Sequence, residues 1–585
     1  MRRAADPPSR FRTVHEALAS AAESDSSLTF VNEREEDTVL PWAVVRARAR
    51  RFAAALRGEG VRPGDRVAIV LPTSPSFPHA FFGTLLAGAI PVPLYPPVRL
   101  GRMAEYHRST ARLLGACGAR LVVSDARIRL LLGPAIAHAR PELGLRLAPD
   151  LLERRGNGAE LEVDADPSAL ALIQFSSGST VDPKPVALTH QNVMSQAAAL
   201  HALMRPLPGT RELGVSWLPL YHDMGLVGAL LSGIYYPGTL VLLPPEAFLV
   251  RPALWLRTIS RFRATISAAP NFGYGLCLKR IRDEDLQGVD LSSWTHALNG
   301  AEPVSAELMA RFADRFAPYG FDPASLRPVY GLSEACLAVT FTPRRWPLRV
   351  ERVDRAHLAR TGEVREGTRT VVSVGAPVPG VAVEIRDERG AAVGERRVGR
   401  IWTRGPSVMR GYFGSDEATA RALPNGWLDT GDLGFELDGE LYVCGRAKDV
   451  VIVRGANHAP QEFEECLDQV EGVRTGCAVA LGLVPESSQS EELLILAERA
   501  GAPDATLPER IRTAIAERTS IRPHTVEILE PGTLPRTSSG KLRRQEALRR
   551  YLAGELARPK RTTASGLALE LVRGAAALAW FGLRR

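Results

Sequence analysis

One hydroxyl-rich loop has the residue types needed to bind phosphate. An apolar run, Ile173-Gln174-Phe175, leads into the loop, and a single lysine, Lys184, follows it. Backbone N–H groups and hydroxyls in such a loop can donate to phosphate oxygens, while Lys184 would add a point charge. The loop is not a Walker A motif, because Pro185 follows Lys184 and the Gly-Lys-Ser/Thr frame is absent. A stretch of this composition is by itself more often an ordinary loop. Its members are Ser176, Ser177, Gly178, Ser179 and Thr180.

Three other polar side chains occur in segments that suit a nucleotide site. His222 lies within the run from Trp217 to Gly228, where glycines interrupt apolar residues. Glu334 ends the run Tyr330-Gly331-Leu332-Ser333-Glu334, and its carboxylate could hold Mg²⁺, which typically takes one or two carboxylates together with phosphate oxygens. Asp432, at the end of Asp429-Thr430-Gly431-Asp432, suits ribose hydroxyls. Each of these residues alone also fits a buried, hydrogen-bonded position or a simple turn.

Lysine is rare in this chain, so each lysine calls for an explanation. Only five of the 73 basic side chains are lysines, and one of them, Lys541, ends the loop Pro535-Arg536-Thr537-Ser538-Ser539-Gly540-Lys541. Lysine offers a compact ammonium on a flexible stem, which the wide fork of arginine cannot replace where one charge must reach one oxygen. Lys541 is therefore a candidate catalytic residue, although a lone lysine in a Ser/Gly loop is usually a surface residue.

The elements that must position these residues follow an α/β pattern. Apolar runs such as Arg66-Val67-Ala68-Ile69-Val70-Leu71 and Leu121-Val122-Val123-Ser124 alternate with helical stretches, and a chain of 585 residues is too long for one hydrophobic core. We therefore expect a large N-terminal domain over residues 1–445 and a small C-terminal domain over residues 450–555. Residues 446–449 would form the hinge between them, and residues 556–585 a linker and an apolar tail.

Composition indicates an ordinary soluble protein and argues against several functional classes. The net charge of +8 comes from arginines interleaved with 65 acidic residues, so no basic block indicates nucleic acid. The mild positive excess suits an acidic protein partner equally well. Six scattered cysteines have no zinc-ligand spacing, so we expect neither structural zinc nor disulfides. No apolar run follows the basic N-terminus, residues 1–12, which leads us to expect a cytoplasmic location.

The C-terminal tail, residues 566–583, is apolar but carries Glu570 and Arg573. Its uninterrupted apolar part, residues 574–583, is too short to cross a bilayer. We expect the tail to pack on the small domain or to be disordered, rather than to contact a membrane peripherally through Trp580 and Phe581.

Taken in order, these motifs resemble the adenylate-forming superfamily of acyl-CoA synthetases, peptide-synthetase adenylation domains and luciferases. The segment Gly445-Arg446-Ala447-Lys448-Asp449 and the loop that ends at Lys541 complete the set, and the resemblance spans roughly residues 11–552. It implies an α/β fold with a large multi-subdomain adenylate-forming N-terminal domain. It also implies a small mobile α+β C-terminal domain that carries Lys541, with Lys448 or Asp449 as the hinge residue.

Within that superfamily the chain is most similar to the fatty acyl-AMP ligases. The signs include Val92-Pro93-Leu94-Tyr95-Pro96-Pro97, Ala269-Pro270-Asn271-Phe272 and the run from Trp217 to Gly228. An extra stretch at about residues 343–370 resembles the insertion that distinguishes these ligases from acyl-CoA synthetases. The small and apolar residues from Leu226 to Leu243 suit an aliphatic tail.

The resemblance implies that ATP and Mg²⁺ are bound by these same residues. Lys184 and the hydroxyl-rich loop would hold the triphosphate, Glu334 would bind Mg²⁺, and Asp432 would take the ribose hydroxyls with Arg446 nearby. His222 would lie beside the α-phosphate and the acid. The adenine would be framed by Gly300, Ala301, Glu302 and Tyr330, and Gly331 and Ser333 belong to the same nucleotide site.

Two residues depart from the pattern of the relatives. Val181 and Pro185 stand where glycine is usual, which stiffens one position and removes one backbone donor. Both changes bear on loop motion and on pyrophosphate release. Because Lys184 and all the hydroxyl residues remain, we expect the activity to be retained.

These residues together predict an enzyme that activates a fatty acid as its acyl-adenylate and releases pyrophosphate. Lys541 would bridge the attacking carboxylate and the α-phosphate after the small domain closes. The acyl group of a medium- or long-chain acid would then pass to the phosphopantetheine thiol of an acyl carrier protein. An acyl-CoA synthetase that uses free CoA is the alternative. A non-catalytic adenylate-binding protein is a third possibility, motivated by Val181 and Pro185.

Overall fold

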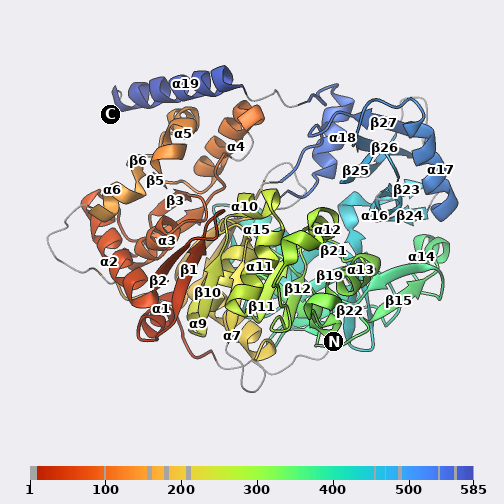
Figure 1. The fold of residues 1–585 in the computed structure, drawn as a ribbon, viewed down its shortest axis with the longest axis horizontal. Helices are drawn as coiled ribbons and strands as arrows, with labels where there is room; N and C mark the ends of the chain where they lie inside the picture. Colours follow the sequence, from red (N-terminus) through yellow and green to blue (C-terminus); the bar gives the residue numbers. More distant parts are fainter. Residues whose placement is uncertain are drawn as a thin grey trace.

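The computed structural model describes residues 9–97, 100–153, 161, 163–176, 183–205, 212–453, 456–467, 470–484, 491–537, 540–558 and 563–583. Its architecture is α/β, as predicted, and consists of a large N-terminal body and a smaller C-terminal body (Figure 1). The small body is drawn in blue at the upper right of Figure 1.

A nine-stranded sheet runs through the large body. Its strand order is β17-β14-β13-β12-β11-β9-β10-β1-β2, and the six strands from β13 to β1 are parallel. Because parallel strands end at the same edge of a sheet, the segments that follow β9, β11, β12 and β13 lie together there. The strands are β1 Ser27–Val31, β2 Asp37–Pro41, β9 Leu213–Ser216, β10 Thr239–Leu242, β11 Ile266–Ala269, β12 His296–Asn299, β13 Leu326–Gly331, β14 Ala338–Phe341 and β17 Ala376–Pro377.

A second, parallel sheet forms the N-terminal part of the large body, in the order β4-β3-β5-β6. Both strands predicted in this region are present, as β3 and β5. The elements are β3 Arg66–Val70, β4 Ile90–Pro93, β5 Leu121–Ser124, β6 Gly144–Leu147, and the helices α2 Trp42–Gly58, α3 Ser76–Leu86, α4 Met103–Ala116 and α5 Ala126–Ala139.

A small antiparallel sheet, β20-β8-β7, holds the two ends of the hydroxyl-rich loop. Strand β7 spans Leu170–Phe175, β8 spans Pro185–Thr189, and β20 spans Gly411–Tyr412. Strand β20 lies more than 200 residues further along the chain than β8, so this pairing brings a distant segment to the loop.

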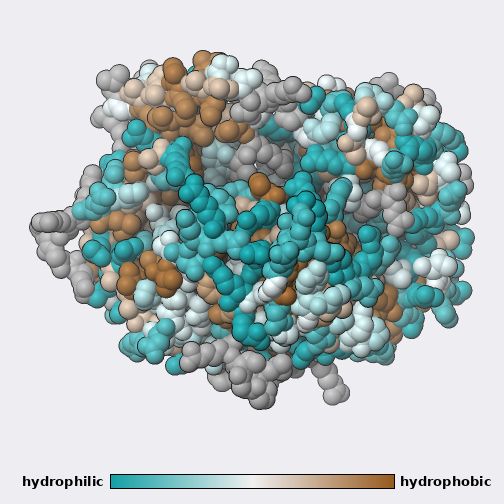
Figure 2. Space-filling model, viewed as in Figure 1, coloured by the Kyte–Doolittle hydropathy of each residue, from teal (hydrophilic) through white to brown (hydrophobic). Residues whose placement is uncertain are grey.

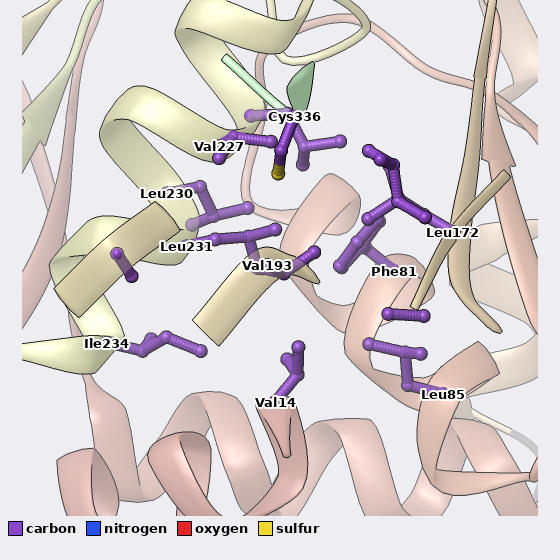
Figure 3. Packing of buried hydrophobic residues seen from close by; sticks show 14 of the residues in the cluster. Val14, Phe81, Leu85, Leu172, Val193, Val227, Leu230, Leu231, Ile234 and Cys336 are labelled. Carbon is purple, nitrogen blue, oxygen red and sulfur yellow. The ribbon is translucent and has the colours of Figure 1, made fainter. Parts of the chain in front are cut away.

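Apolar packing joins these layers into one core (Figure 3). The side chains of Val14, Phe81, Leu172, Val193 and Leu230 come from five different elements and point toward one another. None is more than 1% exposed, and burying a side chain of this size contributes roughly 1.5–3 kcal/mol. Four further elements contribute to this core: α1 Val14–Ala22, α7 His190–Leu203, the π-helix η2 Leu226–Leu231 and α9 Ser232–Tyr235.

The chain leaves the large body through a four-stranded antiparallel sheet, β18-β19-β21-β22. The short 3-10 helix η8, Ala447–Asp449, follows β22 directly, at the position predicted for the hinge. The strands are β18 Ala382–Arg386, β19 Gly399–Arg404, β21 Leu428–Leu437 and β22 Glu440–Arg446.

The small body contains a hairpin, a three-stranded sheet and several helices. The sheet has the order β25-β26-β27, with β25 antiparallel and β27 parallel to the central strand. The elements are β23 Val451–Val453, β24 Ala456–His458, α16 Gln461–Glu464, β25 Val473–Leu483, β26 Glu492–Arg499, α17 Leu507–Thr519, β27 Thr525–Leu529 and α18 Arg544–Leu552.

The stretch predicted to be an insertion forms an antiparallel hairpin with a short helix between its strands. These elements are β15 Val350–Val353, α14 Arg355–Thr361 and β16 Arg369–Val372. The insertion contacts the small body, since Arg369 Nη1 lies 2.7 Å from the Oε1 atom of the buried Glu462. Arg355 Nη1 also donates to the carbonyl oxygen of Arg518 at 2.9 Å.

The C-terminal tail was predicted to pack on the small domain or to be disordered, and this prediction is wrong. The tail forms one helix, α19, Ala564–Leu583, which packs on α5 of the large body rather than on the small body (Figure 1). The crossing is close, because a Cβ atom on Gly133 of α5 would lie 2.2 Å from the carbonyl oxygen of Gly574. Only glycine allows backbones to approach so closely, a feature that the short apolar stretch did not reveal.

Candidate active site

One cavity of about 3170 Å³ is lined by residues of both bodies. Every predicted site residue that the structure describes contributes to its wall. These residues are Ser176, Lys184, His222, Gly300, Ala301, Glu302, Tyr330, Gly331, Ser333, Glu334, Asp432, Arg446, Lys448, Asp449 and Lys541. The other predicted phosphate-binding residues, Ser177, Gly178, Ser179 and Thr180, lie outside the described residues, as does Val181.

A buried carboxylate, Asp432, is fixed by two neighbours. Asp432 on β21 lies opposite Arg446 on β22, and Arg446 Nε is 3.1 Å from Asp432 Oδ1. The hydroxyl of Tyr330, near the end of β13, donates to Asp432 Oδ2 at 2.7 Å. Burial raises the pKa of Asp432 above its usual range, while Arg446 and Tyr330 act in the opposite direction. The result is a fixed acceptor of the kind that binds ribose hydroxyls.

Glu334, Tyr412 and Lys184 form a second cluster beside the hydroxyl-rich loop. The Tyr412 hydroxyl donates to Glu334 Oε1 at 3.0 Å, and Lys184 Nζ lies 4.5 Å from the centre of the Tyr412 ring. Burial raises the pKa of Glu334 and lowers the pKa of Lys184. Burial therefore disfavours the charged form of each group, so a ligand carrying phosphate and a cation would stabilise both charges.

The two ends of the hydroxyl-rich loop are tied together. The N–H of Ser176 donates to the carbonyl oxygen of Lys184 at 2.9 Å, and the N–H of Lys184 donates to Ser176 Oγ at 3.2 Å. Pro185 is the first residue of β8, a position in a strand that proline occupies without harm. Its carbonyl oxygen still accepts from the N–H of Phe413 at 2.8 Å. The sheet therefore accommodates proline at position 185, where relatives usually have glycine.

His222 is held by a buried carboxylate. Nδ1 of His222 lies 2.6 Å from Asp223 Oδ1, and the Ser333 hydroxyl donates to Asp223 Oδ2 at 2.5 Å. Burial would raise the pKa of Asp223, but His222 and Ser333 outweigh burial and hold it below the usual range. Because Nδ1 faces the carboxylate, Nε2 of His222 is the ring nitrogen left for a ligand, and it has no partner among the described residues.

Lys541 reaches the same cavity from the small body. Its backbone N–H donates to Thr537 Oγ1 at 3.0 Å, and its carbonyl oxygen accepts from the Thr537 N–H at 2.8 Å. Burial lowers the pKa of the Lys541 ammonium, and the carboxylates of Asp223, Glu302 and Asp432 partly oppose that shift. The ammonium is thus placed among acidic groups of the large body, where it can neutralise an anionic reaction centre.

Close backbone approach shapes the cavity wall after β12 and β13. A Cβ atom on Gly331 would lie 1.7 Å from the carbonyl oxygen of Leu337, and one on Gly300 would lie 2.7 Å from a valine side chain of β13. Ala301 has a φ angle of +69°, in the left-handed region. Burial raises the pKa of Glu302, which follows directly. Backbone rather than side chain therefore forms this part of the wall, which a flat base can approach closely.

The predicted hinge is bound to the last helix of the small body. Arg544 Nη1 lies 3.4 Å from Asp449 Oδ2, and the same guanidinium pairs with Glu464 at 2.5 Å. Gln545 Nε2 donates to the carbonyl oxygen of Lys448 at 3.0 Å. The residues that leave the large body and the residues that follow Lys541 are thus physically connected.

Two further contacts join the small body to α4 and to Arg102, the residue that precedes α4. Arg550 Nη2, on α18, lies 2.6 Å from Glu105 Oε1. Arg102 Nη2 donates to the carbonyl oxygens of Gly532 at 2.8 Å and Thr533 at 2.9 Å, just before the loop that carries Lys541. These contacts accompany the arrangement in which Lys541 lies in the cavity.

Small residues line another part of the cavity, between η2, α9 and β10. A Cβ atom on Gly233 would meet Leu240 Cδ2 at 3.4 Å, and Gly228 is similarly close to its surroundings, with a contact at 3.0 Å. The predicted apolar stretch from 226 to 243 supplies this wall. The lining also includes a polar pair, in which Glu212 Oε1 lies 3.8 Å from His201 Nδ1. Burial raises the pKa of Glu212 to about 7.

Several functional candidates were missed by the sequence reasoning. Tyr412 comes from a two-residue strand that no periodicity reveals, and only its pairing with β8 brings it to Glu334. Ser333, which was predicted to belong to the nucleotide site, lines the cavity, and its hydroxyl donates to Asp223. The adjacency of Asp223 to His222 was the one signal available for this pair. Nothing in the sequence linked Glu105 to α18.

Comparison with known proteins finds close likenesses along nearly the whole chain. The sequence model of the AMP-binding enzyme family matches residues 18–413. A protein of Caulobacter vibrioides, named provisionally as an acyl-CoA synthetase, is 36% identical over 565 residues, which are 93% of this chain and 96% of that protein. The medium-chain fatty acid acyl-carrier-protein ligase JamA of Moorena producens is 32% identical and matches over 92% of this chain and 95% of its own.

A solved structure gives the same picture in three dimensions. It comes from a study of fatty acyl-adenylate ligases from E. coli and L. pneumophila and superposes with a TM-score of 0.87 at 36% identity. The match covers 93% of this chain and 99% of the other. The large and small bodies described above are therefore an arrangement shared with that structure.

Proposed function

This chain belongs to the AMP-binding enzyme family, and we propose that it uses ATP to convert a fatty acid into its acyl-adenylate with release of pyrophosphate. The observation that carries the proposal is the meeting of Lys541 with Asp432, Glu334 and Lys184 in one cavity lined by both bodies. The relatives named as fatty acyl-adenylate and acyl-carrier-protein ligases support it.

The reaction brings two anions together. A carboxylate oxygen attacks the α-phosphorus of ATP in line, the bond from that phosphorus to the bridging oxygen breaks, and the electron pair leaves with pyrophosphate. No protein nucleophile is required, so the protein contributes position and charge neutralisation. Lys541 would contact both the attacking carboxylate and the α-phosphate oxygens, and this dual contact would lower their mutual repulsion.

His222 would lie beside the α-phosphate and the acid. Its Nε2 could contact a phosphate or carboxylate oxygen, while Asp223 holds the ring in place at Nδ1. Asp432 would accept hydrogen bonds from the ribose hydroxyls, with Tyr330 and Arg446 fixing its orientation. Lys184 would offset charge on the β- and γ-phosphates.

The residues present fit Mg²⁺ at Glu334. That carboxylate has its pKa raised by burial, so its charge is incompletely compensated by the protein. The described residues contain no group of three or more metal-ligating side chains, so the metal would be held by Glu334 together with phosphate oxygens, as Mg²⁺ commonly is. When bound, Mg²⁺ would neutralise charge on the departing pyrophosphate.

The acid is proposed to be a medium- or long-chain fatty acid. The cavity wall built by Gly228, Gly233 and Leu240 offers small and apolar groups, which suit an aliphatic chain. Its position next to the run that contains His222 would place the carboxylate end of the acid near the α-phosphate.

We further propose an acyl carrier protein as the acceptor, through attack of its phosphopantetheine thiol on the acyl carbon with AMP as the leaving group. Free CoA is the second candidate. The name of JamA supports the carrier, whereas the name of the Caulobacter relative supports CoA. The positive net charge suits an acidic carrier.

One contact of the insertion also favours the carrier protein. Residues 454–462 resemble the ligase form of the region that in synthetases meets the pantetheine donor. Arg369 of the insertion pairs with the buried carboxylate of Glu462, within this segment, at 2.7 Å. His458 Nδ1 lies 3.2 Å from the other carboxylate oxygen. A segment restrained in this way is less free to rearrange around CoA.

Pyrophosphate release across fatty, aryl and amino acids, followed by an offer of CoA or phosphopantetheinylated carrier, tests both halves of the proposal. We expect release with fatty acids and thioester on the carrier. Efficient acyl-CoA formation would overturn the acceptor assignment. ATP binding without pyrophosphate release for any acid would instead identify a non-catalytic adenylate-binding protein.

A further inference from the structure

The helix α19 lies on the outside of the large body with little covering it. It runs along α5 at the top of the molecule in Figure 1, and Figure 2 shows hydrophobic residues gathered at the same place. Its segment Ala564–Gly582 is the one helix among the described residues that is long and apolar enough to cross a membrane, and only 6% of its most apolar window is buried. A helix this apolar at a surface is unusual, because surface helices normally carry a polar outer face.

One side of α19 is firmly packed. Leu567, Leu571, Leu578 and Phe581 join the apolar cluster of α4 and α5. A Cβ atom on Gly574 would lie 1.7 Å from a carbonyl oxygen of α5, so the two helices cross in close backbone contact. The inward side of α19 therefore packs against α4 and α5, and this packing fixes which residues face outward.

The outward side of α19 is apolar along most of its length. Leu569 is 50% exposed, Val572 65% and Trp580 39%. The other exposed positions between Leu569 and Trp580 are Arg573, Ala575, Ala576 and Ala579. The two charged residues of the helix, Glu570 and Arg573, pair with each other at 3.1 Å. Water is a poor partner for such a surface, which points to an apolar medium.

Basic residues occur on α5, the helix on which α19 packs. Helix α5 contains the exposed Arg127 and Arg129 and no acidic residue. Arg140, at its end, lies with its guanidinium 5.5 Å from the centre of the Trp580 ring. A tryptophan beside an arginine is typical of the boundary between headgroups and acyl chains, and flanking arginines attract anionic lipid. The charges thus favour a lipid surface over an apolar protein patch.

We propose that α19 docks the protein on a negatively charged lipid surface. The helix lies in the plane of the headgroups, with Leu569, Val572 and Trp580 facing the acyl chains and its other side still packed on α5. It does not span the bilayer, because the residues that contact α5 would then have to leave their partners. This docking would place the enzyme where fatty acids partition, but it does not depend on the proposed reaction.

Co-sedimentation of the full chain with vesicles tests the docking. One set of vesicles consists of phosphatidylcholine alone, and a second set includes phosphatidylglycerol. We expect sedimentation with the anionic vesicles that weakens as salt is raised. Leu569→Asp and Val572→Asp should each reduce partitioning by at least about tenfold, because each replaces an inserted apolar side chain by a charge.

Val39→Asp is the matched control. Val39 is 56% exposed on β2, away from α19, so its partitioning should equal that of the unaltered chain. Fatty-acid-dependent pyrophosphate release in the same variants separates the two proposals, because the outer face of α19 lies outside the cavity and release should be unchanged. The proposal is overturned if the unaltered chain stays in the supernatant with anionic vesicles, or if Leu569→Asp and Val572→Asp sediment as it does. It is also overturned if the chain is a dimer that Val572→Asp converts to a monomer.

Discussion

Arg550 of the small body and Glu105 of the large body form an ion pair, with Nη2 and Oε1 2.6 Å apart. Arg550 lies on α18, the helix that follows Lys541. Both residues of the pair line the cavity, where they join the two bodies. Its side chains are 15% and 36% exposed, so solvent screens it in part. It accompanies the arrangement in which Lys541 lies in the cavity, which is the arrangement proposed for adenylation, and any movement of the small body away from α4 would have to break it.

Glu105→Gln should therefore slow adenylation without abolishing it. Loss of a partly exposed pair costs at most about 1 kcal/mol, so we expect a two- to fivefold fall in the rate of fatty-acid-dependent ATP–pyrophosphate exchange, larger at low salt. Acyl transfer from preformed acyl-adenylate should not slow. Glu142→Gln is the control, because its pair with Arg120 lies entirely within the large body. Equal rates in both variants would show that the contact does not assist closure.

Asp432→Ala should weaken ATP binding. The carboxylate is buried and oriented by Tyr330 and Arg446, so its removal takes away charge-assisted hydrogen bonds to the ribose and should raise the KM for ATP by at least about tenfold. Tyr330→Phe should have a smaller effect in the same direction. Asp438→Asn, at an exposed pair with Arg349 outside the cavity, should leave the KM unchanged. An unaltered KM in Asp432→Ala would remove the ribose assignment.

Tyr412→Phe should move the acidic limb of the pH profile. The Tyr412 hydroxyl lowers the pKa of Glu334, whereas burial raises it. Losing the hydroxyl would raise that pKa further, so Glu334 would become protonated at a higher pH and the exchange rate would begin to fall earlier as the pH is lowered. The ring would still lie beside Lys184. Tyr319→Phe, whose hydroxyl contacts the exposed Asp283, is the control. An acidic limb at the same pH in both variants would contradict the coupling.

Gly233→Leu should shorten the acids that the enzyme accepts. The position faces Leu240 across the apolar part of the cavity, with only 3.4 Å between a Cβ atom and that side chain. A leucine would occupy space proposed for the chain, so pyrophosphate release should be lost with long-chain acids and kept with short ones. Gly115→Leu adds the same side chain on the open surface of α4 and should leave the profile unchanged. Loss of activity with all acids alike would argue against a chain-length role.

The sequence was sufficient for the residues that belong to continuous motifs. Glu334 follows a strand that ends in Tyr330-Gly331, and Asp432 lies in a strand that pairs with Arg446, so local pattern and family resemblance place them correctly in one cavity. The α/β fold followed in the same way from apolar runs such as that of β3. The position of the hinge at 446–449 remains a prediction, although the chain leaves the large body there.

The features that escaped prediction depend on contacts between distant segments. Tyr412 reaches Glu334 only through strand pairing, and Arg550 reaches Glu105 across 445 residues. The tail was misplaced because Gly133 and Gly574 permit a helix crossing that depends on two glycines far apart in sequence. No periodicity within one segment can reveal a partner on another segment.

Fatty-acid-dependent ATP–pyrophosphate exchange by Lys541→Ala tests whether Lys541 is catalytic. We predict a fall of at least about 100-fold, as is typical when a group that stabilises developing charge is removed, with the thermal unfolding midpoint unchanged. Arg263→Ala, which removes an exposed cation that pairs with Asp290 outside the cavity, should retain exchange. Exchange by Lys541→Ala at the rate of the unaltered chain would contradict the account.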